Sequence, residues 1–373
     1  MKILLINWRD IRNPEAGGAE IYNHEIFRRV AAQGNPVTLV SHRFAGAPVE
    51  EMTDGIRTLR VGNRYLFHVQ FRRFYQRWPE RNAFDLVVDG ISKIPLYTRR
   101  YVSGPLAAIL YHFHGKTLFT ELAWPLALYI YRREKRIPRF YADTPIFAIS
   151  PTTRADLIRH GHPEEKTELL FSGIDHGLFA RARPEKSPTP LLAYVGRIKK
   201  YKNLETIVNA LPRVIGQFPD VRLVIGGQGD HEDKIRRYVR SKGMEPHVQF
   251  LGFVPEETKP DVMGKAWLFV TMPEKEGWGI TVIEANAAGT PVVGSDVEGL
   301  RDSIVNNKTG LLVPQGDPNA LAEALVSLLG DRPRIEKMSQ EARAWAAKFN
   351  WDTSAKHFLD SVGRWYPQLK AGC

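Results

Sequence analysis

Two carboxylates, Glu276 and Glu284, have seven residues between them, and glycines at positions 277 and 279 follow the first. In one unbroken helix, a step of about 100° per residue would place the two side chains about 80° apart, which is a poor pair. The glycines instead predict a break, with Glu276 in a loop and Glu284 inside a helix that begins at Ile280. Free N–H groups at that helix start would attract an anion.

A nucleotide sugar has the matching chemistry, because it joins a sugar, a diphosphate and a ribose in that order. We expect Glu276 to hold sugar hydroxyls, the helix start to hold the diphosphate, and Glu284 to hold the ribose diol. The predicted donor-binding segment consists of Glu276, Gly277, Trp278, Gly279, Ile280 and Glu284.

Two cations follow a predicted strand at 191–196. Arg197 comes directly after that strand, and Lys202 precedes the next predicted helix. A guanidinium and an ammonium at such a position form a clamp for a diphosphate. Both, like Glu276, are therefore predicted donor-binding and catalytic residues, whereas Lys199 and Lys200 are expected to face water.

Glycine-rich loops follow two other predicted strands. Gly17 and Gly18 stand just before a predicted helix, and Gly227 lies in the run GGQGD at 226–230. Glycines there let a backbone approach a ligand closely, so all three are predicted donor-binding positions. The spaced glycine fingerprint of dinucleotide sites is missing, and the strand at 36–42 has no acidic residue at its end, which disfavours a nicotinamide enzyme.

The elements that must position these residues alternate between strands and helices. Short apolar runs predict strands in the first half at 2–8, 36–42, 84–90, 106–112 and 145–150, and in the second half at 191–196, 221–227, 247–253, 266–272, 290–296 and 309–314. Helical segments such as 204–218 and 317–330 lie between them. The pattern predicts an α/β protein with two doubly wound, Rossmann-like domains facing a cleft, with ligands beyond the carboxyl ends of the strands.

The proline-rich stretch 180–190 is the best candidate for a linker. We therefore expect an N-terminal acceptor-binding domain at 1–179 and a C-terminal donor-binding domain at 191–350. An amphipathic helix in the last segment, about 351–373, follows the second domain.

The composition of the chain indicates its expected partners and cellular location. Its net charge of +11 favours anionic partners, and its single cysteine, Cys373, fits a reducing cytoplasm. No apolar run approaches the roughly 18 residues that a membrane-spanning helix needs, and the first residues read as a buried strand rather than a signal peptide. We expect a cytoplasmic protein.

The run EGWGITVIEANAAGTPVV resembles the Glu-x7-Glu motif of retaining glycosyltransferases of family 4 (glycosyl transferases group 1), which have the GT-B fold. GGAE, VGRIKKYKN, VIGGQGD, LGFVP and GLLVPQGDPNALAEAL occur in that family's order. The resemblance implies that Glu276 binds the donor sugar, Glu284 the ribose, and Arg197 and Lys202 the diphosphate. It also implies that the C-terminal helix crosses back to the first domain. The family's usual Asn near the domain junction is replaced here by Ser172.

The same resemblance implies a histidine near the reacting sugar, after the fourth main strand of the first domain. His112 is the expected catalytic residue by position, and His114 is the fallback. The resemblance also implies retention of anomeric configuration by front-face displacement, which needs no protein nucleophile, only positioning and stabilisation of the leaving group. Because the chain has no Asp-x-Asp pair, we expect neither a metal nor a cofactor beyond the nucleotide sugar.

The acceptor is expected to be a saccharide or a lipid-linked sugar of envelope polysaccharide or glycolipid synthesis. Within 66–78, a helical stripe of Phe67, Phe71, Phe74 and Trp78 with arginines beside it could contact an anionic membrane, and a second basic cluster lies at 131–140. The alternative is that the stripe faces the protein's own sheet. We therefore consider the inner face of the cytoplasmic membrane as a location.

Three other functions stay open from the sequence. An epimerase of sugar nucleotides would use the same fold, and a phosphorylase would need a lysine for pyridoxal phosphate, for which no convincing candidate exists. A basic nucleic-acid-binding protein would explain the charge, but the chain carries no helix-turn-helix, zinc or RNA-binding signature, so no nucleic-acid partner is expected.

Overall fold

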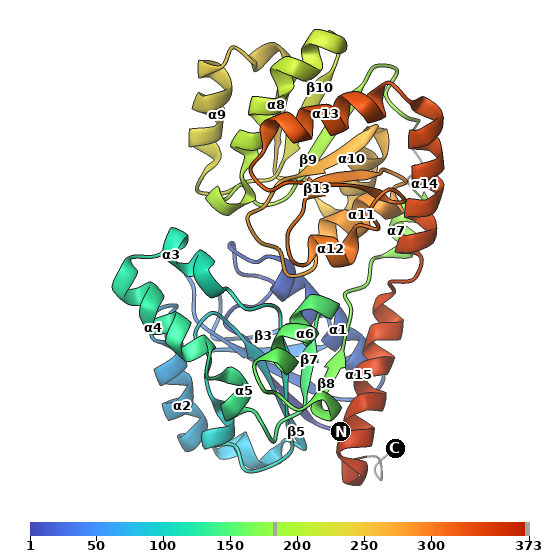
Figure 1. The fold of residues 1–373 in the computed structure, drawn as a ribbon. Helices are drawn as coiled ribbons and strands as arrows, with labels where there is room; N and C mark the ends of the chain where they lie inside the picture. The colour runs from blue at the N-terminus through green and yellow to red at the C-terminus, as the bar shows by residue number, and fades with distance from the viewer. Residues whose placement is uncertain (182–184, 370–373) are drawn as a thin grey trace. The chain divides into compact units, whose positions relative to one another are not determined.

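The computed structural model describes residues 1–181 and 185–369. The chain divides into two compact units: Met1–Gly173 together with the segment beginning at Trp351, and Ile174–Asn350 (Figure 1). Each unit is built on its own sheet with helices on both faces. The predicted α/β class with two doubly wound domains is confirmed.

Within the described residues, the sheet of the first unit has eight strands in the spatial order β3-β4-β2-β1-β5-β6-β7-β8. The strands are β1 (Ile3–Ile6), β2 (Val37–Ser41), β3 (Glu50–Thr53), β4 (Ile56–Arg60), β5 (Leu86–Ile91), β6 (Leu106–Leu110), β7 (Ile146–Ala148) and β8 (Thr167–Leu169). All pairs are parallel except β3 with β4. Each strand predicted for the first half is present. The hairpin β3–β4 and the edge strand β8 were not predicted, because β3 and β8 are short and polar.

The helices of the first unit are α1 (Gly18–Ala32), α2 (Phe67–Arg77), α3 (Leu118–Glu121), α4 (Trp124–Glu134), α5 (Ile137–Phe140), α6 (Pro151–Arg159) and α15 (Trp351–Trp365), with 3-10 turns η1 (Pro79–Ala83), η2 (Thr98–Arg100), η3 (Gly115–Thr117), η4 (Glu164–Lys166) and η8 (Pro367–Leu369). Three of the four aromatic residues of the 66–78 stripe, Phe67, Phe71 and Trp78, are buried against β1, β2 and β5. Of the two alternatives stated for the stripe, the structure shows the second, in which it faces its own sheet.

The second unit has a parallel sheet in the order β11-β10-β9-β12-β13-β14, counted over the described residues. Its strands are β9 (Leu191–Val195), β10 (Arg222–Gly226), β11 (Val248–Gly252), β12 (Leu268–Thr271), β13 (Val292–Ser295) and β14 (Gly310–Val313), and each coincides with a predicted strand. The order reverses between β9 and β12, which pair through Leu192 and Leu268. Ligands in such sheets bind at this reversal, beyond the carboxyl ends of the strands.

The helices of the second unit are α7 (His176–Arg181), α8 (Leu204–Gln217), α9 (Glu232–Ser241), α10 (Lys259–Lys265), α11 (Ile280–Ala287), α12 (Leu300–Ser303), α13 (Pro318–Leu329) and α14 (Arg332–Ala346), with 3-10 turns η5 (Lys200–Lys202), η6 (Glu245–His247) and η7 (Glu256–Thr258). One face of the sheet packs on α8 and α13, whose apolar residues recur at helical spacing. The other face packs on α11 through Val282 and Ala285. Burial on both faces explains why the strands are continuously apolar.

The boundary between the units lies at Gly173/Ile174, six residues before the expected end of the first domain. Ile174 forms a bridge with Asn350, and His176 bonds the carbonyl of Phe349, so these residues belong to the second unit. Of the expected linker 180–190, residues 182–184 lie outside the described residues. Beyond them, Lys186 donates to the carbonyls of Ala266 and Gly289, which ties this stretch to the second unit.

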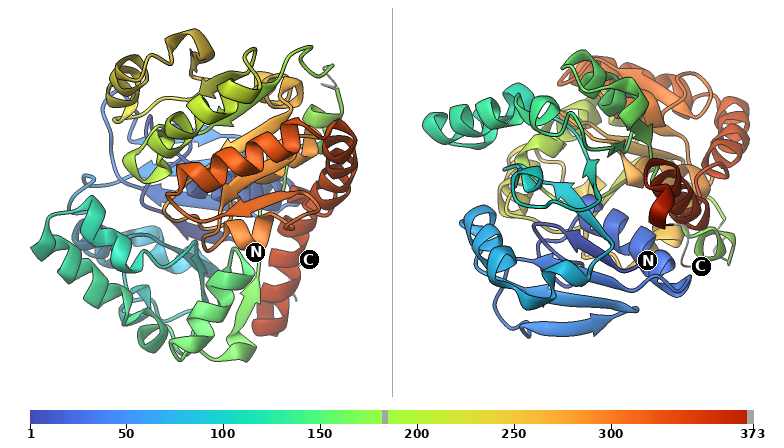
Figure 2. Two further views of the ribbon diagram at one scale, coloured as in Figure 1. Left: turned by 45° about the horizontal axis from the view of Figure 1, so that its top comes forward. Right: turned by 90° about the horizontal axis from the view of Figure 1, so that it is seen from below.

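The helix α15 packs on the first unit, beside α1 and the edge strand β8 (Figure 1, Figure 2). Arg29 of α1 donates to the carboxylate of Asp352 at 2.7 Å. At the other end of the helix, Arg364 pairs with Glu168 of β8. The chain therefore returns to its first unit after completing the second.

Candidate functional site

The loops after β9 and β12 meet at the reversal of the second sheet. Arg197 and Lys202 lie on the first loop, and Glu276 lies on the second. The ammonium of Lys202 donates to Oε2 of Glu276, and the N–H of Glu274 donates to the carbonyl of Tyr201 at 2.8 Å. Parallel neighbouring strands place their carboxyl ends at one edge, which explains how side chains 74 positions apart meet.

The Lys202–Glu276 pair is largely buried, with side-chain exposures of 14% and 22%. Burial alone would lower the pKa of Lys202, but the nearby Glu276 carboxylate outweighs it and the pKa is raised. The lysine therefore stays protonated at neutral pH. It provides a positive charge in a fixed position at the point where the strand order of the second sheet reverses.

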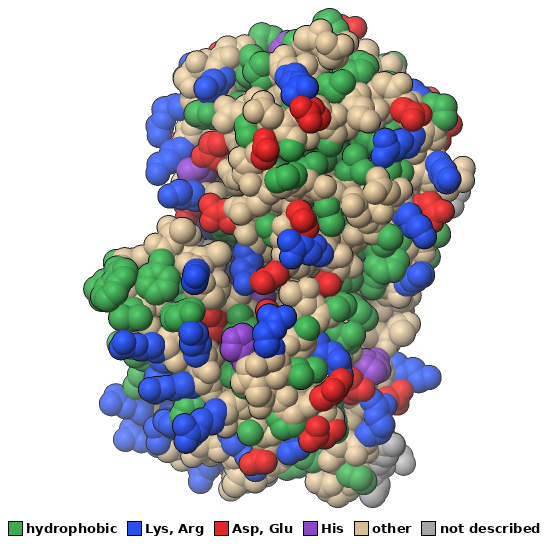
Figure 3. All heavy atoms as spheres, in the orientation of Figure 1, with side chains coloured by type: hydrophobic (Ala, Val, Ile, Leu, Met, Phe, Trp, Pro, Cys, Tyr) green, Lys and Arg blue, Asp and Glu red, His purple; other side chains and the backbone are tan. Residues whose placement is uncertain are grey.

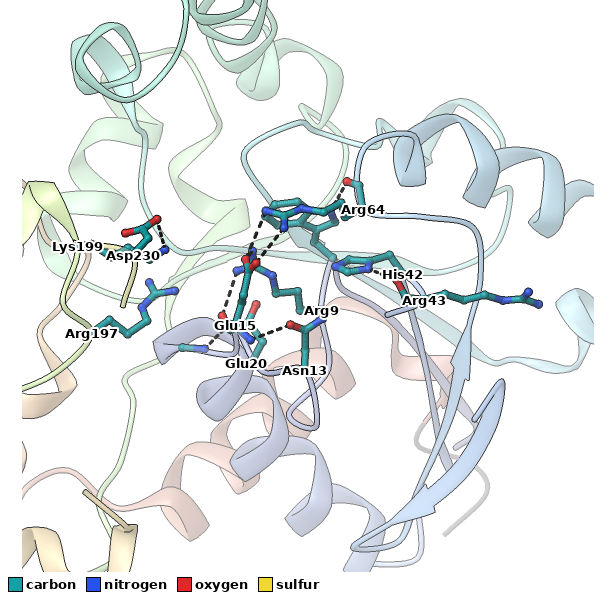
Figure 4. Close-up of polar contacts among 12 residues, drawn as sticks. Arg9, Asn13, Glu15, Glu20, His42, Arg43, Arg64, Arg197, Lys199 and Asp230 are labelled. Carbon is teal, nitrogen blue, oxygen red and sulfur yellow. Dashed lines mark hydrogen bonds and ion pairs between the residues drawn. The ribbon is translucent and has the colours of Figure 1, made fainter. Parts of the chain in front are cut away.

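Arg197 is held by two tyrosines, one on β9 and one in η5. The hydroxyl of Tyr194 donates to the carbonyl of Arg197 at 2.8 Å, and Nη2 of Arg197 donates to the hydroxyl of Tyr201 at 3.3 Å. The positions of the backbone and of the guanidinium are thus both defined. Figure 4 shows Arg197 near the ion pair of Lys199 and Asp230, whose charged atoms are 2.8 Å apart.

The glycine-rich loop after β10 supports the loop that carries Arg197. Gly227 has a φ of +127°, and a Cβ there would lie 1.9 Å from the carbonyl oxygen of Gly196. A Cβ at Gly229 would lie 2.1 Å from the carbonyl oxygen of Ile198. The N–H of Gly196 donates to the carbonyl of Gly226 at 3.0 Å. Glycine is therefore required at 227 by the packing of these two loops.

The predicted break in the 276–284 segment is present. Gly279 has a φ of +85°, and α11 begins at Ile280, the next residue. Glu276 and Gly277 belong to the loop, and Glu284 lies on the second turn of the helix. The indole of Trp278 is only 2% exposed and contacts the ring of Phe349 edge-on at 5.1 Å, so this predicted donor-binding side chain lies in the interior.

Glu284 faces a lysine that was not predicted. Nζ of Lys259, at the start of α10, lies 3.2 Å from Oε1 of Glu284 and 2.7 Å from Oε1 of Glu256. Burial raises the pKa of Glu284, and the charge of Lys259 opposes that rise. For Lys259, burial lowers the pKa, but the two carboxylates outweigh it and the net direction is upward. Each predicted donor-binding glutamate is thus paired with a protonated lysine.

In the first unit, Gly17 precedes the helix α1, which begins at Gly18. The N–H of Gly17 donates to Oε2 of Glu20 at 2.8 Å, so this predicted anion-binding donor is occupied by a carboxylate of its own helix. The preceding loop is held by Glu15, which pairs with Arg9 and with Arg64 (Figure 4). The loop is thus defined by charged side chains as well as by its glycines.

The two predicted histidines lie just after β6. The ring centroids of His112 and His114 are 4.4 Å apart with an interplanar angle of 66°, and both residues are half-buried. The buried carboxylate of Glu134 accepts hydrogen bonds from the N–H groups of His114 and Gly115. This contact from α4 holds the turn, and it gives no preference between the two rings.

Sequence reasoning missed Lys259 and Tyr201. Tyr201 lies inside the quoted run VGRIKKYKN, where a tyrosine between lysines was a visible signal. Lys259 follows two glutamates in PEETKP, a polar run without an apolar period. Its contact with Glu284 joins residues 25 positions apart, and no local pattern predicts it.

Across 1–181 and 185–369, no three His, Cys, Asp or Glu side chains gather where they could hold a metal ion. Over the same residues, no helix combines the length and apolar character that crossing a bilayer requires.

Comparison with known proteins agrees with this geometry. Residues 178–345 match the family model of glycosyl transferases group 1, and residues 16–178 match that of glycosyltransferase family 4. The chain is 27% identical to a GDP-mannose-dependent alpha-(1-6)-phosphatidylinositol monomannoside mannosyltransferase of Mycobacterium tuberculosis, over 93% of this chain and 94% of that protein.

Two solved structures share the fold. Sucrose-phosphate synthase from Thermosynechococcus elongatus superposes with a TM-score of 0.79 at 24% identity, covering 100% of both chains. Anabaena HepE in complex with UDP and glucose superposes with a TM-score of 0.77 at 17% identity, covering 98% of this chain and 100% of that one. The two family matches together run from residue 16 to residue 345, and the chain belongs to the family 4 glycosyltransferases of group 1, with the GT-B fold.

Proposed function

We propose that this glycosyltransferase moves a hexose from a nucleoside-diphosphate sugar to a saccharide or lipid-linked acceptor, with retention of anomeric configuration. The observation that carries the proposal is the charged cluster at the reversal of the second sheet. Lys202 and Arg197 follow β9, and Glu276 follows β12. Cations beside a carboxylate at that edge suit a diphosphate beside a hydroxylated sugar.

In the proposed reaction, the bond between the anomeric carbon and the β-phosphate oxygen breaks. The acceptor oxygen bonds that carbon on the same face, and the acceptor proton passes to the departing diphosphate. Arg197 and Lys202 stabilise the charge that develops on this leaving group. Glu276 positions the sugar hydroxyls, and the ring of His112 or His114 contacts the reacting sugar.

The remaining donor contacts follow from the loops around this cluster. Glu284 accepts hydrogen bonds from the ribose hydroxyls, and the N–H groups at the start of α11 bind the diphosphate. Gly17, Gly18, Gly227, Gly277 and Gly279 bring backbone close to the donor. Trp278 contributes through its backbone, because its ring is buried.

GDP-mannose and a UDP-sugar are both candidate donors. The mycobacterial relative is named as GDP-mannose-dependent, and HepE was solved with UDP and glucose. We propose that the positive charges of Arg197 and Lys202 replace a metal ion and that no other cofactor takes part. The proposed setting is the inner face of the cytoplasmic membrane, in the synthesis of envelope polysaccharide or glycolipid.

Calorimetric titration with UDP, GDP, ADP and NAD tests the donor site, on the wild type and on Glu284→Ala. One diphosphate should bind, and Glu284→Ala should weaken it at least about tenfold, equal to about 1.4 kcal/mol. Glu256→Ala is the matched control, because Glu256 contacts the same lysine but is largely exposed. If Glu284→Ala binds as well as the wild type, the assignment of this segment is overturned.

Turnover with the diphosphate sugar that binds separates transfer from epimerisation. NMR of the product should show a new glycosidic bond with the donor's anomeric configuration, and activity should persist in EDTA. An inverted product would contradict the proposed mechanism, and loss of activity in EDTA would contradict metal independence. A changed sugar on an intact nucleotide would identify an epimerase.

A further inference from the structure

The turn after β6 has the backbone conformation of an anion-binding site. His114 lies in the right-handed helical region, with a φ of −71° and a ψ of −38°, and Gly115 lies in the left-handed region, with a φ of +60°. Two successive residues in these conformations direct their N–H groups into one concave site for a negative charge. Glycine suits the second position because the left-handed region is strained for most other residues. The turn that carries the two candidate histidines is therefore shaped to hold an anion.

The anion in this site is the side chain of Glu134, the last residue of α4. Its Oε1 accepts a hydrogen bond from the N–H of His114, and its Oε2 accepts one from the N–H of Gly115 at 2.8 Å. The hydroxyl of Thr117 donates to the carbonyl of His114 at 2.7 Å. Side chains thus hold both backbone polar groups of His114.

Stability alone does not account for a carboxylate at this place. Glu134 is 4% exposed, and burial of a charge costs free energy unless hydrogen bonds offset it. A negative charge at the C-terminal end of a helix is also unfavourable, because the last carbonyls are partially negative. Figure 3 shows Lys and Arg side chains gathered over α2 and α4, and this positive surface reduces the cost without removing it. An apolar residue would avoid both costs, so the charge indicates a role in the turn.

The end of α4 is itself held in place. The hydroxyl of Tyr97 donates to the carbonyl of Arg133 at 2.7 Å, and the guanidinium carbon of Arg133 lies 4.5 Å from the centre of the Tyr97 ring. One turn earlier, Ile130 packs against Leu118, which directly follows the turn η3. The carboxylate of Glu134 therefore stands on a fixed support, and α4 determines where the histidine turn lies.

We propose that Glu134 is a positioning residue for sugar transfer. It fixes the backbone of the turn, so that the ring of His112 or His114 lies where it contacts the reacting sugar. This role rests on the proposed function, because it requires that one of the two rings contacts the donor sugar. The carboxylate is buried against the turn, so Glu134 acts through the histidines and not on the substrate itself.

Glu134→Gln removes the charge and keeps the size of the side chain. The amide oxygen can accept from one N–H, but the amide nitrogen would face the other N–H donor, so the turn loses a hydrogen bond. A catalytic group displaced by about 1 Å can cost about 100-fold in rate, and kcat should fall by about that factor. The KM for the donor and the affinity for the diphosphate should stay unchanged. Glu165→Gln, which changes an exposed carboxylate of the same unit, is the control and should keep the kcat of the wild type.

Combination with histidine variants separates positioning from a general loss of stability. When Glu134→Gln is added to the variant that lacks the sugar-contacting histidine, either His112→Ala or His114→Ala, it should cause little further loss of kcat. Residues that act as a unit are not additive, so the background without further loss identifies the histidine that contacts the sugar. The full loss in both backgrounds would overturn the proposal, because Glu134 would then act independently of the histidines.

A second pair of variants changes the turn and leaves Glu134 and α4 intact. A Cβ at Gly115 would meet no atom within 4 Å, so the backbone conformation and not the available space decides the outcome. Asparagine tolerates the left-handed region, whereas valine does not. Gly115→Val should therefore have a kcat at least about tenfold below that of Gly115→Asn. Equal kcat values for the two variants would contradict the need for this turn conformation.

Hydrogen exchange on the amides of His114 and Gly115 tests the contact without any substrate. Both amides should exchange slowly in the wild type and at least about tenfold faster in Glu134→Gln. Fast exchange in the wild type, or faster exchange in Glu134→Gln with an unchanged kcat, would overturn the proposal. A wild type that turns over no diphosphate sugar would instead overturn the proposed function and the catalytic meaning of the turn with it, whereas slow exchange would still establish the contact of Glu134.

Discussion

Lys259 and Glu284 form a buried ion pair, with Nζ 3.2 Å from Oε1 and 3.5 Å from Oε2. Burial raises the pKa of Glu284, and Lys259 provides the charge that opposes this rise. A carboxylate that accepts hydrogen bonds from a ribose diol must be ionised, because a protonated carboxyl loses acceptor capacity. Lys259 is therefore a positioning residue for the proposed ribose contact.

Replacement of Lys259 by methionine should make diphosphate binding depend on pH. Without the ammonium, burial is no longer opposed, and the pKa of Glu284 should rise further. The variant should bind at least about tenfold more weakly than the wild type near pH 6, and recover as pH rises and Glu284 ionises. Calorimetric titration between about pH 6 and about pH 9 measures this profile.

The groups that face Glu284 from neighbouring elements are Lys259 of α10 and Glu256 of η7. Lys259→Arg restores the charge, so its diphosphate affinity should not depend on the ionisation of Glu284 in this pH range. If Lys259 had a purely structural role, the pH profile of diphosphate binding by Lys259→Met would run parallel to that of the wild type. If Glu284→Ala abolishes binding while Lys259→Met shows no pH dependence, the donor site stands and the role of Lys259 is wrong.

The Lys202–Glu276 pair predicts coupled effects on turnover. Glu276→Gln should lower kcat about 100-fold, because it removes the sugar contact and the partner of the leaving-group lysine. Lys202→Met should lower kcat by a similar factor. The double variant should lose much less than the product of the two factors, since residues in one ion pair act as a unit. Exposed Lys200→Met is the control, and multiplicative losses would refute the coupling.

Much of the fold follows from the sequence because parallel strands buried on both faces are continuously apolar. Each run of that kind, such as 191–196 and 266–272, became a strand. The hairpin β3–β4 could not be found in this way, because Glu50 and Met52 are exposed on an edge strand. The buried ion pair of Arg60 and Asp10 could not be predicted either. Nε of Arg60 lies 2.9 Å from Oδ2 of Asp10, and the two residues are 50 positions apart.

The candidate site was predictable where a local pattern determines it. Gly279 breaks the segment just before α11 as expected, because the left-handed conformation favours glycine. The burial of the Trp278 ring could not be predicted, since nothing in its neighbours reveals the contact with Phe349 more than 70 positions away. The contact of Lys259 could not be predicted for the same reason, because its partner Glu284 is brought near only by the packing of α10 on α11.

Gly227→Ala should destabilise the second unit and weaken diphosphate binding. The Cβ would meet the carbonyl of Gly196 at 1.9 Å, and a φ of +127° is strained for any residue with a side chain. The loop that carries Arg197 would have to move, so we expect a loss of at least about 2 kcal/mol in the free energy of unfolding. Gly216→Ala, in the open on α8, should leave stability unchanged or raise it. Urea denaturation of both variants measures the change in the free energy of unfolding. An unchanged midpoint for Gly227→Ala would contradict the requirement for glycine at this position.

The buried carboxyl of Asp89 on β5 predicts a pH dependence of stability. It accepts a hydrogen bond from the hydroxyl of Thr98 at 2.7 Å and another from Tyr141. Burial raises the pKa of Asp89 from 3.8 to about 6, against the opposing effect of these hydrogen bonds. The stability contributed by the protonated form is present in full below about pH 4 and is lost as pH rises through about 6.

Asp89→Asn cannot ionise, so its stability should not fall through this range. Relative to the wild type, the variant should gain about 1.5 kcal/mol in free energy of unfolding between about pH 5 and about pH 8, out of about 3 kcal/mol for the whole shift. This gain is independent of any constant cost of the amide, because it is a difference between two pH values. Asp220→Asn, a substitution on an exposed turn, is the control. Its free energy of unfolding should change with pH in the same way as that of the wild type. Urea denaturation at both pH values measures the difference, and parallel curves for Asp89→Asn would mean that Asp89 titrates in the folded protein as it does in the unfolded chain.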